Sequence, residues 1–140
     1  MPHFSSTSRE RLLSCDSRLI AVCSDAIAHF DFSVVCGHRT DEEQDILFAQ
    51  GRITEGPIVT YKRGGESIHN TMPSRAIDLA PWVSGRGIVW DEPVLFGELA
   101  GVIMYCAWKR GIDVTWGGHW MSFKDYPHFQ IPKRTHPVIA

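Results

Sequence analysis

The chain has 140 residues, a length typical of one domain, and 44% of them are hydrophobic while 21% are charged, so we expect a single globular domain over residues 1–140. Its 14 basic and 16 acidic side chains give a formal net charge of −2 at pH 7, which argues against a nucleic-acid binder because such a protein presents a basic face. No stretch approaches the roughly 20 apolar residues of a membrane span, and the N-terminus lacks the basic start and apolar run of a signal peptide, so we expect neither membrane insertion nor export by a leader.

The first part of the chain predicts a helix followed by a strand. Thr7 and Glu10 have the spacing of a capping box ahead of an apolar series. The apolar residues that follow recur at helical intervals, which predicts one helix over residues 8–29. Residues 31–36 are rich in β-branched and aromatic side chains and predict a strand.

A second helix and a long loop are expected next. Thr40 and Glu43 form another capping box, and a glycine follows the apolar series, which predicts a short helix over residues 41–50. Residues 51–70 are rich in glycine and polar side chains and predict a loop, with a short strand near residues 58–61. Long loops in compact domains are often functional.

The last part of the chain predicts three strands and one helix. Residues 75–81 alternate between apolar and polar side chains, as strands do. Asp91 is the expected cap of a helix that has a proline in its first turn and Gly111 just past its end. Residues 113–116 and 127–131 predict two short strands. Helices and strands mix without a βαβ rhythm, which favours an α+β fold with a small antiparallel sheet and flanking helices.

Histidines and acids suggest a metal site. The four cysteines form no Cys-x-x-Cys pair, which argues against a thiolate zinc site. Spacing alone does not separate four candidate histidines: His38, His69, His119 and His128. His69 and His128 with Asp78 would form the three-ligand set of a catalytic zinc site, which leaves the fourth position to a water whose pKa falls to about 7. Asp125 lies three residues before His128 and would take the proton of that water.

Several motifs occur in a fixed order along the chain. They are Gly37-His-Arg39-Thr40 with Glu43-Gln44, Gly51-Arg52, Ser67-x-His69, Ala76-x-Asp78, Trp116-Gly-Gly-x-Trp120 and Asp125-x-Pro-His128-Phe129. Together they resemble the zinc peptidases of the lysostaphin, D-Ala-D-Ala and hedgehog superfamily. Within it, the sequence is most similar to phage endolysins that are L-alanyl-D-glutamate peptidases. The likeness runs from about residue 34 to residue 132 and implies a hedgehog-like and DD-peptidase-like fold.

The resemblance implies a role for each matched residue. The Zn²⁺ ligands would be His69, Asp78 and His128, and Asp125 would be the catalytic base. Arg39 would hold the substrate or its developing oxyanion, since a guanidinium offers two donors. We expect further substrate contacts from four residues of the motifs: Gln44, Ser67, Trp116 and His119. Ser67 is also expected to position the ligand loop by a hydrogen bond, and Trp120 is expected to wall the cleft together with Trp116.

Two positions depart from the family pattern. The first histidine and the aspartate are nine positions apart rather than seven, because Met72-Pro73-Ser74 stands where a single glycine is common. We expect the loop to absorb the two extra residues by bulging between fixed ends. In the Trp-Gly-Gly motif, His119 replaces an acid or amide.

The resemblance implies a zinc-dependent hydrolase of peptidoglycan stem peptides that cuts the L-Ala-D-Glu bond. We expect a monomeric phage or prophage endolysin, made in the host cytoplasm and then released to the periplasm and cell wall. Three alternatives stay open: a D-Ala-D-Ala carboxypeptidase or dipeptidase on the same scaffold, a non-catalytic zinc or cell-wall binding module, and a structural virion protein. The intact Asp125 argues against the binding module. A Cys–His protease built on Cys36 would need a partner histidine that the sequence does not place.

Overall fold

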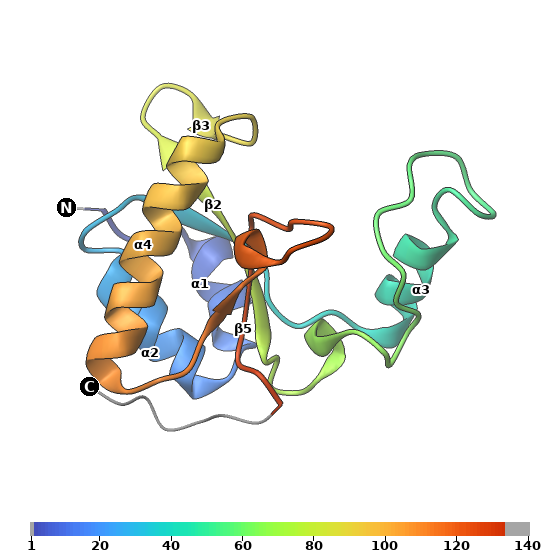
Figure 1. The fold of residues 1–140 in the computed structure, drawn as a ribbon, viewed down its shortest axis with the longest axis horizontal. Coiled ribbons are helices and arrows are strands. Elements are labelled where there is room, and N and C mark those ends of the chain that lie inside the picture. Colours follow the sequence, from blue (N-terminus) through green and yellow to red (C-terminus); the bar gives the residue numbers. More distant parts are fainter. Residues whose placement is uncertain (1, 134–140) are drawn as a thin grey trace.

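A small antiparallel sheet lies at the centre of the computed structural model, which describes residues 2–133 (Figure 1). The sheet runs in the order β1 (Phe32–Cys36), β2 (Ala76–Val83), β5 (His128–Gln130) and β4 (Thr115–Trp116), and β3 (Gly87–Ile88) pairs with the far end of β2. All four pairings between these strands are antiparallel. The predicted α+β class with a small antiparallel sheet is therefore confirmed.

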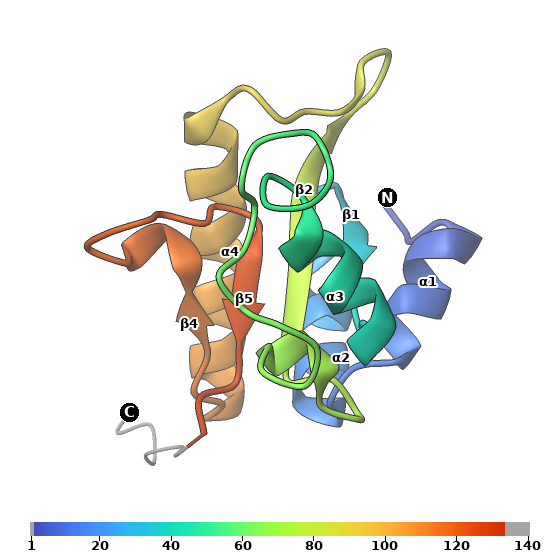
Figure 2. The same cartoon turned by 90° about the vertical axis from the view of Figure 1, so that its right-hand side faces the viewer.

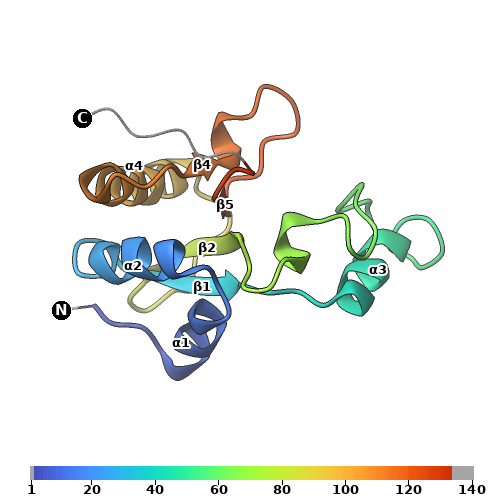
Figure 3. The same cartoon turned by 90° about the horizontal axis from the view of Figure 1, so that it is seen from below.

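Helices cover one side of this sheet and leave the other side to a separate helix and its loop. Figure 3 shows α2 (Ser17–Ala26) and α4 (Pro93–Arg110) together on one side, with α1 (Ser6–Leu13) beside β1. On the opposite side lies α3 (Asp41–Ala49), followed by a long loop. The hydrophobic core fills the space between α2, α4 and the sheet, and the strand residues that face it, such as Ile77, Leu79 and Phe129, are apolar. A binding or catalytic site on the sheet must therefore lie on the face toward α3.

The predicted helix over residues 8–29 is wrong, because the segment forms two helices, α1 and α2. The cap of α1 is Ser5, whose hydroxyl accepts a hydrogen bond from the backbone of Ser8, rather than the expected box that begins at Thr7. Leu12 of α1 and the apolar face of α2 are buried in the same core, so the hydrophobic periodicity continues across the break. Periodicity alone therefore gave no sign of two helices.

The break between α1 and α2 also holds the lengthened loop before β2. The backbone N–H of Ser74 donates to the carbonyl of Ser14 at 3.0 Å, and the N–H of Asp16 donates to the carbonyl of Ser74 at 2.8 Å. On the other side of the loop, Thr71 Oγ1 accepts from the N–H of Arg75 at 2.9 Å. The two extra residues before Asp78 thus lie in a loop with both ends fixed, as expected.

Asp16 is the N-cap of α2, and we expect its removal to destabilise the fold in a pH-dependent way. Its carboxylate accepts from the backbone and the guanidinium of Arg18, each at 2.9 Å, and the side-chain hydrogen bond from Arg18 lowers the pKa of Asp16. Asp16→Ala should cost about 1–2 kcal/mol of unfolding free energy at pH 7. Since the folded pKa is depressed, this stability exists above the unfolded pKa of about 3.9 and is lost as pH falls through the folded pKa.

Urea unfolding of the wild type and of Asp16→Ala at pH 7 and pH 3 checks this expectation. Asp16→Asn is the matched control, because it keeps the cap acceptor and removes only the charge. A difference between wild type and Asp16→Ala that stays the same at both pH values would contradict the ionic part of the argument.

The other predicted helices are present with small shifts at their ends. The capping box of α3 forms as expected, with reciprocal hydrogen bonds between Thr40 and Glu43 at 3.0 and 3.1 Å. The cap of α4 is Glu92 rather than Asp91, without a side-chain hydrogen bond, and Gly111 ends the helix at a φ of 68°. No helix within residues 2–133 is both long and apolar enough to cross a lipid bilayer.

Short elements are where the structure departs further from the predictions. Residues 58–61 form no strand and belong to the loop after α3. Three short elements were not predicted: β3 and two single turns of 3-10 helix, η1 (Ile68–Asn70) and η2 (Gly117–His119). Both turns contain residues of the motifs: His69 lies in η1, and Gly117, Gly118 and His119 form η2.

Candidate metal centre and active site

Asp78 and His128 lie opposite each other on the neighbouring strands β2 and β5. The next pair in the register, Ile77 and Phe129, is buried in the hydrophobic core. Because successive side chains of a strand point to opposite faces, Asp78 and His128 both point away from the core, toward the side of α3. The register of two strands therefore brings together residues that are 50 positions apart.

His69 reaches the same place from the turn η1. Ser67 Oγ caps this turn by accepting from the backbone N–H of His69 at 3.2 Å, and the Asn70 side chain accepts from the N–H of Ser67 at 3.1 Å. The carbonyl of Gly37 lies 2.9 Å from Nδ1 of His69 and accepts a hydrogen bond from it in the Nδ1–H tautomer. This leaves Nε2 of His69 to face Asp78, and it gives Ser67 the positioning contact that the sequence predicted.

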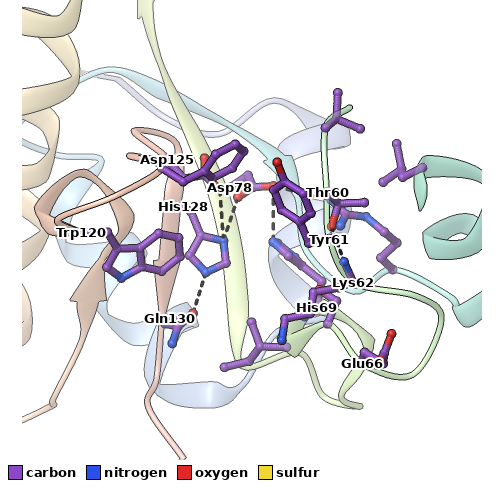
Figure 4. A pocket seen from close by; sticks show the side chains of 16 residues that line it. Thr60, Tyr61, Lys62, Glu66, His69, Asp78, Trp120, Asp125, His128 and Gln130 are labelled. Atoms are coloured by element: carbon purple, nitrogen blue, oxygen red, sulfur yellow. Dashed lines mark hydrogen bonds and ion pairs between the residues drawn. The ribbon is translucent and has the colours of Figure 1, made fainter. Parts of the chain in front are cut away.

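The two imidazoles approach different oxygens of one carboxylate, as the dashed lines of Figure 4 show. Nε2 of His69 lies 3.3 Å from Oδ2 of Asp78, and Nδ1 of His128 lies 3.4 Å from Oδ1. Ligand atoms that sit about 2.0–2.1 Å from one tetrahedral ion are separated by roughly 3.3–3.4 Å, so each of the two distances, taken singly, fits such an edge. Oδ1 of Asp78 is buried and has no hydrogen-bond partner among the described residues. A buried acceptor of this kind suits a ligand of a cation.

Further donor atoms surround the same carboxylate. Asp78 with His128 and Asp125 forms one group whose ligand atoms lie within 4.8 Å of one another, and Asp78 with His69 and Cys36 forms another. The rings of His69 and His128 meet edge to face, 5.2 Å between centroids. Two nitrogen donors and a carboxylate are ligands that divalent transition ions accept. The donor set present therefore fits a metal ion.

The electrostatics of the candidate metal centre also favour a positive charge next to Asp78. Burial disfavours the charged form of Asp78, yet the contacts with His128 and His69 outweigh it and lower the pKa of this carboxyl. Burial likewise opposes protonation of His69, but the contacts with Asp78 and Cys36 raise the pKa of His69 to about 10. Without a metal, a proton on His69 balances the charge of Asp78; a bound cation would take over that role.

Asp125 stands beside this centre because a tight loop returns to the sheet. Its backbone N–H donates to the carbonyl of Gly117 at 3.1 Å, and its carbonyl accepts from the N–H of His128 at 3.2 Å. A Cβ on Gly117 would collide with the carbonyl oxygen of Asp125, which explains the glycine. The carboxylate lies 4.0 Å from Nδ1 of His128, and burial, followed by the charge of Asp78, raises the pKa of Asp125. A carboxyl with a raised pKa beside a metal site suits proton transfer.

Arg39 completes the charged groups and is held in place by Gln44. Its Nη2 lies 3.7 Å from Oδ2 of Asp78, and its Nη1 donates to Oε1 of Gln44 at 2.8 Å. The amide of Gln44 is buried and donates in turn to the carbonyl of Lys62 at 2.8 Å. The predicted substrate contact of Gln44 is therefore corrected: the side chain does not line the cleft, and it positions Arg39 and the loop instead.

A cleft of about 600 Å³ opens over these residues. Figure 2 shows α3 and its following loop in front of β2, and this loop forms one wall of the cleft. Figure 4 shows the walls from close by, with Thr60, Tyr61 and Lys62 on one side and Trp120 and His128 on the other. A volume of this size is within the range of small-ligand sites, so the candidate metal centre is open to a substrate segment.

A family model described as phage L-alanyl-D-glutamate peptidase matches residues 1–135 of this chain. The chain belongs to the phage L-alanyl-D-glutamate peptidase family. This membership agrees with the family that the sequence motifs indicate.

Two known proteins are similar to this chain, one in sequence and one in structure. The peptidoglycan L-alanyl-D-glutamate endopeptidase CwlK of Bacillus subtilis (strain 168) is 39% identical over 107 residues, which are 72% of this chain and 60% of that protein. The chain thus matches less than two thirds of the length of this relative. The crystal structure of the Serratia marcescens L-Ala D-Glu endopeptidase ChiX is similar with a TM-score of 0.73 and 26% identity, covering 94% of this chain and 91% of that chain.

Two predicted substrate contacts of this peptidase family member lie outside the cleft. Trp116 is buried, donates its indole N–H to the carbonyl of Tyr126 at 2.7 Å and stacks on Phe129, so it belongs to the core. His119 is exposed, and its ring packs edge-on against Trp116 with 4.9 Å between centroids. Both expectations are corrected by this geometry, whereas Trp120 lines the cleft as expected.

Sequence reasoning also missed residues that support or line the site. Gln130 Oε1 lies 2.7 Å from Nε2 of His128, so an Nε2–H would be bound there and Nδ1 would face Asp78. The strand period could have revealed this, because residues two apart share a face. Tyr61 and Phe123 line the cleft from two irregular loops, and no sequence periodicity pointed to them.

Proposed function

We propose that this chain is a zinc-dependent endopeptidase that hydrolyses the L-Ala-D-Glu bond of peptidoglycan stem peptides. The observation that carries the proposal is the Asp78 carboxylate: its buried Oδ1 has no hydrogen-bond partner among the described residues, and its two oxygens lie 3.4 Å from Nδ1 of His128 and 3.3 Å from Nε2 of His69. Family membership and the names of the two relatives support the choice of bond.

Three residues would hold the ion: His69 through Nε2, His128 through Nδ1 and Asp78 through its carboxylate. When bound, zinc supplies Lewis acidity toward the scissile carbonyl and lowers the pKa of a water to about 7. The carbonyl of Gly37 and the amide of Gln130 fix the two rings from behind. Such outer contacts set the tautomer and direction of each imidazole.

The remaining residues act on protons and charges of the substrate. Asp125 takes a proton from the attacking water on its carboxylate and passes it to the amine of D-Glu as the C–N bond breaks. Its raised pKa suits a group that must both accept and return a proton near neutral pH. Arg39, held by Gln44, faces the cleft with a fixed positive charge for the carbonyl oxygen or a stem carboxylate.

A digest of purified peptidoglycan tests the proposal. The protein is incubated with the wall polymer with and without a chelator, its metal content is measured, and new peptide ends are identified by mass spectrometry. We expect one zinc ion per chain and new D-Glu amino ends that are absent with chelator. Released D-Ala would instead indicate a carboxypeptidase, and an intact polymer would indicate a binding or structural protein.

We expect Gln130 to govern zinc affinity through His128. Gln130→Leu removes the acceptor at 2.7 Å from Nε2 and should weaken zinc binding by roughly 10- to 100-fold. Gln130→Glu keeps an acceptor there and should retain most of the affinity. Competition with a chromophoric chelator measures both values, and a wild-type affinity in the leucine variant would contradict the assigned role.

We also propose that the chain acts as a phage or prophage lysin, made in the host cytoplasm and reaching the wall after another agent opens the membrane. Membership of a phage family supports this proposal. Host cells that produce the protein should grow until the membrane is permeabilised and should lyse after that. Lysis without permeabilisation would contradict it.

A further inference from the structure

Two exposed aromatic rings meet across the mouth of the cleft. Tyr61 comes from the loop after α3, Phe123 comes from the loop before β5, and both line the cleft. Their rings meet edge to face with 5.9 Å between centroids. Even so, 67% of Tyr61 and 60% of Phe123 remain exposed to solvent. The proposed mechanism uses neither ring, although hydrophobic side chains at a cleft commonly mark a binding surface.

The loop that carries Tyr61 is anchored on both sides of it. Gln44 donates from its side-chain amide to the carbonyl of Lys62 at 2.8 Å, and Arg52 donates to the carbonyl of Thr60 at 3.1 Å. The guanidinium of Arg52 also lies 5.7 Å from the centroid of the Tyr61 ring. A ring held by its neighbours in this way loses little freedom when a ligand packs on it.

The loop that carries Phe123 is anchored at the cost of backbone strain. Phe123 has a φ of 53°, the left-handed region that residues with a side chain rarely adopt. Lys124 Nζ donates to the carbonyls of Gly118 and Trp120 at 3.2 and 3.0 Å, and the N–H of Asp125 is bound next to them. Strain that is maintained by such bonds concentrates at functional sites. Here it presents an exposed phenyl ring beside the proposed base.

The chemistry of the proposed substrate indicates which of its groups would contact these rings. In peptidoglycan, L-Ala is joined through its amino group to the lactyl group of muramic acid. The scissile bond and the sugar ring are therefore separated by the length of about two residues, roughly 7 Å of extended chain. Beyond D-Glu, the stem carries carboxylates, which suit the charged groups Arg39 and Lys62 of the cleft. The uncharged aromatic pair instead suits the C–H face of a pyranose ring.

We propose that Tyr61 and Phe123 form a saccharide subsite that binds the muramoyl sugar next to the scissile bond. This inference rests on the proposed function, because it takes the bond after the first stem residue as the site of cleavage. It makes the enzyme selective for stems that are still attached to glycan. The sugar would pack on the exposed surfaces of the two rings, one from each wall of the cleft.

Two matched substrates test the subsite on the zinc-loaded protein. One is a muramoyl tetrapeptide, and the other is the same tetrapeptide with an acetyl group on L-Ala in place of the lactyl sugar. We expect wild type to prefer the muramoyl substrate in kcat/KM. Tyr61→Ala and Phe123→Ala should each reduce that preference by roughly tenfold, the effect of removing one aromatic contact. Tyr61→Phe should keep it, because the ring remains.

The control is Tyr105→Ala, which removes an exposed ring on α4 that stacks on Trp108, outside the cleft. It should leave the preference unchanged. If Tyr61→Ala and Phe123→Ala lowered kcat/KM equally on both substrates, the saccharide subsite would be refuted and the rings would instead serve as a gate. If wild type cut neither substrate, the proposed function would fail, and this outcome is separate from a loss of preference.

Discussion

Asp125→Asn should abolish most hydrolysis while zinc stays bound. The amide keeps the shape of the carboxylate and cannot accept the proton of the attacking water, so kcat should fall by roughly 10²- to 10⁴-fold. The three proposed ligands are unchanged in this variant, and the Asp125 carboxylate lies 4.0 Å from Nδ1 of His128. Release of D-Glu amino ends from peptidoglycan gives the rate, and metal analysis gives the zinc content.

Asp91→Asn is a suitable control for this variant. Its side chain is 84% exposed, does not line the cleft and makes a long 3.9 Å contact with Arg86, so its loss should leave hydrolysis unchanged. Hydrolysis at the wild-type rate by Asp125→Asn would remove Asp125 from the mechanism. Loss of zinc from this variant would make Asp125 a ligand rather than a base.

Much of the fold was predictable, because most elements carry their own local signals. The box of Thr40 and Glu43 and the stop at Gly111 appear where the sequence places them. The break at Asp16 was not predictable from periodicity, because it is made by Ser74, a residue 58 positions away that binds the chain on both sides of the break. Long-range backbone pairing leaves no mark in a local pattern.

The candidate metal set was predicted from motif order rather than from spacing. Spacing alone left four histidines open, and the structure brings two of them, His69 and His128, to Asp78. The motifs name residues but do not say which way side chains point. Trp116 was expected in the cleft and lies in the core, where Gly118 packs against its ring at a distance that leaves no room for a Cβ.

The cleft walls were the least predictable part of the site. Tyr61 and Phe123 sit in loops that are 62 positions apart and have no period, so nothing in the sequence relates them. Their approach depends on Gln44, which was expected to touch substrate and instead ties α3 to the loop of Tyr61. A motif residue can thus act by holding a wall in place.

Asp78→Asn should have the largest effect on metal binding, because this residue touches both proposed imidazole ligands. The change removes the charge that His69 and His128 share and leaves one amide nitrogen where an oxygen faced a ring. Zinc affinity should fall by roughly 100-fold or more, beyond the 10- to 100-fold typical of a residue that only orients a ligand. Gln130→Leu should therefore bind zinc more tightly than Asp78→Asn.

Thermal unfolding with added zinc measures the difference in zinc affinity between wild type and Asp78→Asn without any assay of activity. An ion that binds only the folded chain stabilises it by RT ln(1 + [L]/Kd), about 4 kcal/mol at a zinc concentration 1,000 times Kd. Wild type should gain this stability, and Asp78→Asn should gain little at the same concentration. The metal-free variant should remain folded, because His69 can lose its proton once the carboxylate that raises its pKa is gone. Equal stabilisation of both proteins by zinc would place the ion elsewhere, since loss of the Asp78 charge must weaken any site to which this carboxylate contributes.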